Sequence, residues 1–170
     1  VTDGLANNGV MALMEDRKNR LWVGTWIGMS RKTDETFEPL PQLGDNNVYS
    51  VLEDRNGHIW LATLLGGVYR WDGEQLSNFT VAEGLCDGFV RIVYEDWDGF
   101  VWIGTATGLS RWDGHGFTNF TDADGLAGNW VQAILQDRNG ILWFGTNGGL
   151  SYFDGQTFAT LDSSDGLVHN

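Results

Sequence analysis

The sequence predicts an all-β protein: a β-propeller built from four-stranded antiparallel blades, with four blades in the chain. Three observations predict this fold. A tryptophan-centred strand pattern recurs at Trp22, Trp60, Trp102 and Trp143, at intervals of 38, 42 and 41 residues. Asn-Gly and Asp-Gly pairs, which favour two-residue hairpin turns, recur at fixed places in each repeat. No segment keeps a period of 3.6 residues for more than a turn or two, which argues against helices.

Each repeat reads as four strands. The first is apolar and ends in an acidic pair such as Glu53-Asp54. The second is the tryptophan strand, for example Val101–Thr105, and the third begins at a glycine such as Gly108. The fourth strand carries a phenylalanine and leads into an Asp-Gly-Leu sequence or a variant of it. We assign the phenylalanines of this last strand as Phe37, Phe79, Phe120 and Phe158.

Short turns connect the strands into an antiparallel meander. Asn56-Gly57 and its equivalents separate the first two strands, and Asp72-Gly73 and its equivalents separate the last two. Both central positions of a type I′ turn need positive φ, which these pairs tolerate. The predicted blades span approximately residues 6–44, 45–86, 87–127 and 128–167.

The tryptophan strands are apolar on both faces. In the third repeat, Val101 and Ile103 alternate with Trp102 and Gly104. A sheet that is apolar on both faces must lie between two neighbours, as propeller blades do. We expect the small residue two places after each tryptophan to leave room for a ring from the next blade. Pro39 and Pro41, in the most degraded repeat, suit an edge strand.

The number of blades in the closed ring stays open at this point. Asp3-Gly4-Leu5 recurs as Asp165-Gly166-Leu167 four repeats later, so both ends fall at one point of the repeat. An open half-ring would expose two large apolar faces. Three arrangements follow: a homodimer closing an eight-bladed ring, a ring completed by the remaining repeats of a longer chain, and a compact four-bladed monomer.

The repeats resemble a known family. The third repeat carries Trp102-Ile103-Gly104-Thr105, Gly108-Leu109-Ser110-Arg111 and Asp124-Gly125-Leu126, and the fourth follows the same pattern from Asp137 to Leu167. These motifs are similar to the two-component regulator propeller repeat. The resemblance implies a sensor region of a bacterial hybrid histidine kinase, located in the periplasm or outside the cell. It also implies a ligand derived from polysaccharide.

Composition excludes several classes of function. The net charge is −13, and such a surface repels a nucleic-acid backbone. Cys86 is the sole cysteine, which excludes an internal disulfide. No apolar run reaches membrane-spanning length, so we expect no membrane contact by this segment. His58, His115 and His169 show no catalytic spacing to Cys86 or a serine, and we expect no catalysis.

A ligand site is expected at the end of the propeller that carries the loops between blades and the loops between second and third strands. These loops vary between repeats while the strands do not. Large aromatic and apolar side chains there suit stacking against a sugar, and Arg91 suits a bidentate contact to a uronic acid. The alternative is that they cover the edge of the core. The candidates are Trp26, Leu64, Phe89, Trp130, Tyr49, Arg91 and Gln132.

A second hypothesis concerns the opposite end. Asp16, Asp54, Asp96 and Asp137 share one repeat position, and a circle of carboxylates could hold Ca²⁺. Capping of the hairpin turns explains the same carboxylates without a metal, and no other cofactor is expected. The function predicted first is therefore a glycan-binding sensor propeller. The alternative is a structural propeller fragment, excised or engineered, whose main activity is homo-oligomerisation through its blade faces.

Overall fold

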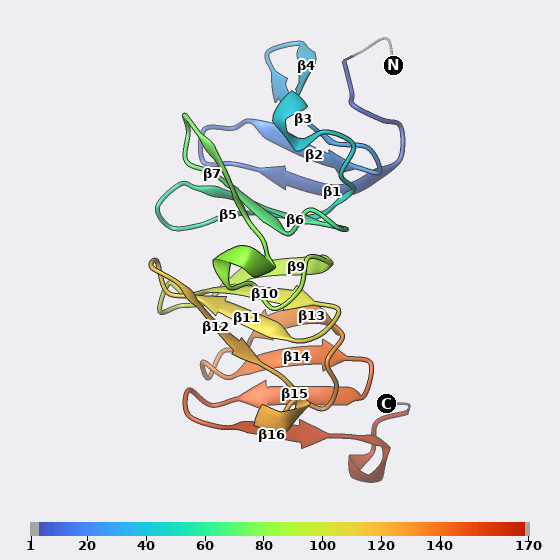
Figure 1. Ribbon diagram of the computed structural model, residues 1–170, viewed down its shortest axis with the longest axis vertical. Helices are drawn as coiled ribbons and strands as arrows, with labels where there is room; N and C mark the ends of the chain where they lie inside the picture. The colour runs from blue at the N-terminus through green and yellow to red at the C-terminus, as the bar shows by residue number, and fades with distance from the viewer. Residues whose placement is uncertain (1–3, 169–170) are drawn as a thin grey trace.

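The computed structural model describes residues 4–168, which form four separate four-stranded antiparallel sheets (Figure 1). The first two sheets comprise β1 (Val10–Glu15), β2 (Leu21–Thr25), β3 (Met29–Thr33), β4 (Thr36–Pro39), β5 (Val48–Glu53), β6 (Ile59–Thr63), β7 (Val68–Trp71) and β8 (Leu76–Phe79). The last two comprise β9 (Val90–Glu95), β10 (Val101–Thr105), β11 (Leu109–Trp112), β12 (Phe117–Phe120), β13 (Val131–Gln136), β14 (Leu142–Thr146), β15 (Gly149–Phe153) and β16 (Phe158–Leu161). Short 3-10 helices follow the fourth strands: η1 (Pro41–Leu43), η2 (Val81–Glu83), η3 (Asp122–Asp124) and η4 (Ser163–Asp165).

Every sheet has its strands in chain order, so the predicted all-β fold of meander blades is confirmed. In each blade the first two strands are antiparallel. The start of the first strand pairs with the end of the second, as Val48 does with Thr63, and its end pairs with the start of the second, as Glu53 does with Ile59. The loops between blades and the loops between second and third strands therefore share one end. The turns that contain the Asn-Gly and Asp-Gly pairs lie at the other end. The prediction of two-residue type I′ turns is wrong: Glu53 pairs with Ile59 and Trp71 with Leu76, and only the glycine of each pair has positive φ.

The strand register corrects one sequence assignment. Phe37 pairs with Lys32, as Leu76 pairs with Trp71 and Phe117 with Trp112. Phe37 and Phe158 thus occupy a different repeat position from Phe79 and Phe120. The position of Phe79 is taken by Leu40 in the first blade, where its N–H donates to the carbonyl of Met29. Turn length sets the register, and the first blade turns at Asp34 without an Asp-Gly pair.

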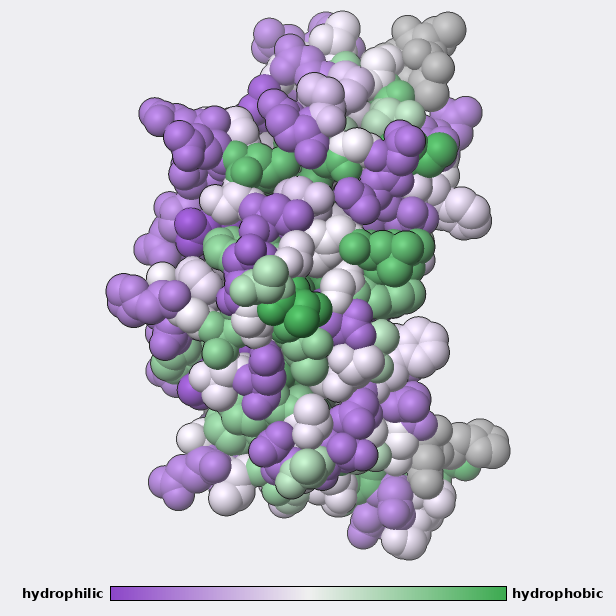
Figure 2. All heavy atoms as spheres, viewed as in Figure 1, coloured by the Kyte–Doolittle hydropathy of each residue, from purple (hydrophilic) through white to green (hydrophobic). Residues whose placement is uncertain are grey.

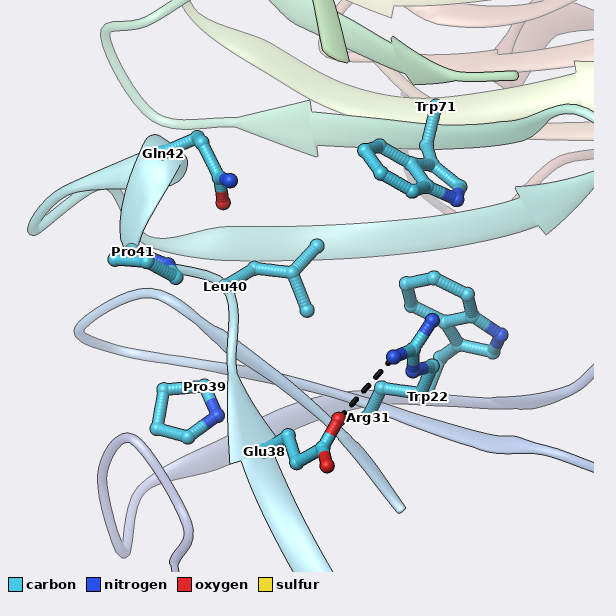
Figure 3. A pocket seen from close by; sticks show the side chains of 8 residues that line it. All are labelled: Trp22, Arg31, Glu38, Pro39, Leu40, Pro41, Gln42 and Trp71. Carbon is cyan, nitrogen blue, oxygen red and sulfur yellow. Dashed lines mark hydrogen bonds and ion pairs between the residues drawn. The ribbon is translucent and has the colours of Figure 1, made fainter. Parts of the chain in front are cut away.

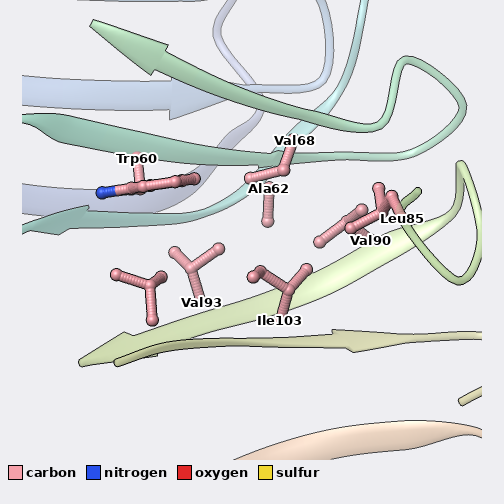
Figure 4. Packing of buried hydrophobic residues seen from close by; sticks show 8 residues of the cluster. Trp60, Ala62, Val68, Leu85, Val90, Val93 and Ile103 are labelled. Carbon is pink, nitrogen blue, oxygen red and sulfur yellow. The ribbon is translucent and has the colours of Figure 1, made fainter. Parts of the chain in front are cut away.

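The core lies between blades. One cluster joins the second and third blades, and Figure 4 shows Trp60, Ala62 and Val68 facing Val93 and Ile103. Two further clusters join the first blade to the second and the third blade to the fourth. Burial of both blade faces is what the two-sided apolar pattern of the tryptophan strands requires.

Two of the repeated tryptophans pack on rings of the following blade. Trp60 lies edge-on to Trp112, with ring centroids 6.1 Å apart, and Trp102 lies in the same way to Phe153 at 5.7 Å. The expectation that a ring enters beside the small residue is wrong. A Cβ at Gly104 would lie 2.9 Å from the backbone oxygen of Val131, so this glycine lets the next blade's first strand approach closely.

The four blades form an open array. The first and fourth blades lie at opposite ends of the longest axis (Figure 1). Val10 is 45% exposed, whereas Val48, Val90 and Val131, at the same repeat position, are fully buried. Leu13 is 65% exposed on the same outward face. The described residues thus do not close a four-bladed ring, and apolar side chains stay exposed on the outward faces of the first and fourth blades.

Candidate ligand-binding rim

The predicted ligand residues lie on the end that carries the loops between blades, here called the rim. Each blade ties its two rim loops together with one backbone hydrogen bond. The N–H of Trp26 donates to the carbonyl of Gly9, and that of Leu64 donates to the carbonyl of Asn47. Ala106 and Asn147 donate in the same way to Phe89 and Trp130. The rim loops are thus fixed to the blades, and their side chains hold defined positions.

Three predicted residues from three blades form an aromatic ladder. The rings of Tyr49 and Phe89 are stacked, with centroids 6.2 Å apart and planes 18° apart. The rings of Phe89 and Trp130 meet edge to face at 6.3 Å. Tyr49 and Phe89 are half-buried, and Trp130 is exposed. The ladder runs from blade to blade, because strands β5, β9 and β13 contact one another in turn.

Arg91 stands on this ladder. Its guanidinium lies 4.6 Å from the centroid of the Tyr49 ring. Among the described residues, no hydrogen bond or ion pair involves the Arg91 side chain, which is half-buried. A stacked guanidinium keeps its five N–H donors in a fixed fork that matches a carboxylate. The Arg91 guanidinium is therefore positioned to bind an anionic group.

The remaining rim candidates are not joined to the ladder. Trp26 is 60% exposed and packs over Gly9, and Gln132 is exposed. Leu64 is half-buried, whereas its neighbour Leu65 is 77% exposed and escaped the sequence analysis. Figure 2 shows strongly hydrophobic groups on the edge of the molecule toward the rim. The rim thus presents separate apolar side chains beside one ordered ladder.

The four aspartates at the opposite end cap the hairpin turns. The Asp54 carboxylate accepts hydrogen bonds from the backbone N–H groups of Asn56 and His58 and from the Trp60 indole, each at 2.9 Å. The same indole contact is made by Trp22 to Asp16, Trp102 to Asp96 and Trp143 to Asp137. Within residues 4–168, no group of three or more His, Cys, Asp and Glu side chains is placed to hold a metal. Each carboxylate is thus engaged within its own repeat, as the capping alternative expects, and the Ca²⁺ site stays a prediction.

The hydrogen bonds that each of these aspartates accepts from its turn and from its tryptophan are here called the clamp. The clamps make the free energy of unfolding depend on pH. Burial alone would raise the pKa of Asp54, but hydrogen bonds from Trp60 and His58 outweigh burial and lower this pKa. The pKa of Asp16 is lowered in the same way, by hydrogen bonds from Trp22 and Arg20. An aspartate in the unfolded chain titrates near pH 3.9, so the clamps contribute fully above about that pH. We expect the free energy of unfolding to fall as pH drops through the lower pKa values of the folded state. Urea unfolding between about pH 6 and pH 2.5 measures this, and Asp54→Asn should flatten the curve.

A small pocket of about 170 Å³ lies between the first and second blades (Figure 3). Pro39, Leu40 and Pro41 form one wall, and Trp22 and Trp71 lie opposite. Arg31 pairs with Glu38 at 3.2 Å beside it. The pocket is too small for an oligosaccharide, so it does not compete with the rim as a glycan site.

Comparison with known proteins identifies the repeats. Residues 4–27, 42–64 and 125–148 match the family described as two component regulator propeller. The matched segments cover less than half of the 170 residues, and they are similar to two-component regulator propeller repeats. The third repeat, whose motifs between Trp102 and Leu126 carried the resemblance in the sequence, lies almost wholly outside the matched segments. No curated protein matches the chain.

Solved structures share the repeat architecture. Two extracellular domains from B. thetaiotaomicron, each assigned to a hybrid two component system, are both 22% identical, with TM-scores of 0.67 and 0.74. The matches cover 96% and 94% of this chain but 30% and 25% of those chains. A virginiamycin B lyase from Staphylococcus aureus matches at 16% identity and a TM-score of 0.73, over 93% of this chain and 57% of the lyase. These likenesses show a propeller fold, which serves both sensors and enzymes.

Proposed function

We propose that this chain is the ligand-binding part of an extracytoplasmic sensor propeller and that its rim binds an acidic oligosaccharide without transforming it. The free guanidinium of Arg91, stacked on Tyr49, carries the proposal. The ladder supplies apolar faces on which sugar rings can stack, and Arg91 supplies a bidentate partner for a uronic acid. The location proposed is the periplasm or the outside of the cell, as for the two extracellular domains that share the fold.

Three further observations bear on this proposal. The net charge of −13 repels an acidic ligand at a distance, so binding must depend on short-range contact with Arg91. None of the helices in residues 4–168 has the length and apolar character needed to cross a membrane. Signalling belongs to a longer protein in this proposal, since the chain spans 25% to 30% of the two extracellular domains.

Titration with trigalacturonate tests the proposal. We expect a saturable change in tryptophan fluorescence, because Trp130 ends the ladder. The methyl-esterified trimer, which has the same rings and no charge, should bind at least about tenfold more weakly, because a hydrogen bond to a charged group contributes about 1.5–3 kcal/mol. Arg91→Ala should weaken binding of the acid by a similar factor and leave the ester unaffected.

Lys18→Ala is the matched control for Arg91→Ala. It removes one positive charge from an exposed turn at the end opposite the rim. It should leave the affinity for trigalacturonate unchanged. Equal affinity for the acid and the ester, or equal losses in the two variants, would contradict the proposed role of Arg91.

A further inference from the structure

The two uncovered blade faces carry the two halves of one junction. Within the chain, each blade binds the next through a turn contact, an apolar surface and, between the second and third blades, a cation on an aromatic ring. We infer that the fourth blade of one copy binds the first blade of a second copy in the same manner. This inference is independent of the proposed ligand.

The turn contact recurs at every internal junction. A backbone N–H next to the clamping aspartate donates to the last residue of the next blade's first strand. Arg17 donates to Glu53 at 2.8 Å, Arg55 to Glu95 at 2.9 Å, and Trp97 to Gln136 at 2.8 Å. The Arg55 side chain adds an ion pair to Glu95 at 2.9 Å.

The fourth blade presents one of these two partners, and the first blade presents the other. Arg138 occupies the repeat position of Arg55, and Glu15 occupies the position of Glu95. Both are exposed, and among the described residues neither takes part in a side-chain hydrogen bond or an ion pair. A junction of the fourth blade with a first blade would therefore join an arginine to a glutamate, as the junction of Arg55 with Glu95 does.

The apolar parts of the end faces match in the same way. Leu135, at the repeat position of Leu52, is 60% exposed on the fourth blade. Leu13, at the position of Val93, is exposed on the first blade. Leu52 and Val93 themselves pack in one cluster between the second and third blades. The end faces thus expose the residues that internal junctions bury.

A third pair of side chains, a cation and an aromatic ring, also has its counterpart on the end faces, but with the cation and the ring on opposite blades. Arg70 of the second blade lies 5.9 Å from the ring centroid of Trp112 in the third. Strand register places Tyr152 at the position of Arg70 and Lys32 at the position of Trp112. The cation and the aromatic ring have exchanged blades, so their attraction is retained across the inferred junction.

A second copy is the partner that fits these residues. The second and third blades lie between the first and the fourth, so the two halves do not meet within one molecule (Figure 1). Two copies can form the junction twice, related by a twofold axis, and bring eight blades together. A junction between unlike faces that does not close would instead add further copies.

Mass in solution, measured by light scattering across a wide range of concentration, tests the inference. We expect about 38 kDa, twice the 18.9 kDa of one chain. Glu15→Arg and Arg138→Glu should each raise the dissociation constant at least tenfold, because each places like charges together. The double variant, which restores an opposite pair, should recover association. Larger assemblies that respond to the same variants would also support the junction.

Glu74→Arg is the matched control, since it makes the same charge change on an exposed turn away from both faces. Circular dichroism checks that every variant stays folded. A monomer at all concentrations would overturn the inference. So would a dimer that ignores the single reversals, or a double variant that stays dissociated.

Discussion

Replacing Trp60 with alanine is expected to lower the free energy of unfolding by about 3–5 kcal/mol. The indole is fully buried between the second and third blades and contacts the rings of Phe79 and Trp112. Its loss leaves a cavity that rigid neighbouring strands cannot fill, and it removes a hydrogen bond to Asp54. Urea unfolding followed by circular dichroism measures the change.

Trp97→Ala is the control for this experiment. Trp97 is an exposed tryptophan in the third blade's turn, and its loss should cost less than about 1 kcal/mol. Similar losses for the two variants would show that the interface between blades does not hold the array together.

Removing the Asp54 carboxylate has the second-largest expected effect. Asp54→Ala should lower the free energy of unfolding by about 2–4 kcal/mol, because the Trp60 indole and two turn N–H groups lose their acceptor. Asp54→Asn should cost less, since an amide oxygen can still accept. The double variant with Trp60→Ala should cost less than the sum, because both changes break one hydrogen bond.

Asp98→Ala supplies the comparison on an equivalent turn of the next blade. This carboxylate is exposed, and among the described residues it accepts no hydrogen bond, so its loss should change stability by less than about 0.5 kcal/mol. If Asp98→Ala lowered the free energy of unfolding as much as Asp54→Ala does, the effect of Asp54→Ala would come from removing a negative charge and not from breaking the clamp.

Local signals made the blades predictable. The clamp joins Asp54 to Trp60, six residues along the chain, and the hairpin turn lies between these two residues. One short stretch of sequence therefore contains every group of the clamp. The strand order follows from the Asn-Gly and Asp-Gly turns for the same reason. The register of Phe37 was missed because turn length, rather than spacing between phenylalanines, decides which residues pair.

Contacts between blades were beyond reach of the sequence. Tyr49 and Phe89 lie 40 residues apart in the chain, and their stacking depends on how closely two first strands approach. The glycine at 104 sets that approach for the next pair of blades through the backbone of Val131. Likewise, whether Leu64 or Leu65 faces solvent depends on the hydrogen bond that Leu64 makes to Asn47. The candidate residues could be named, but the ladder could not.

The open array is the claim on which the inferred junction depends, because a closed ring of four blades would bury both end faces. It is tested most directly by the distance between spin labels on Leu13→Cys and Leu135→Cys, in a Cys86→Ser background diluted with unlabelled chain. We predict a distance beyond contact range within one molecule, since the labels stand on β1 and β13 and the second and third blades lie between these strands (Figure 1). A contact-range distance would mean that the first and fourth blades meet, and it would contradict the account.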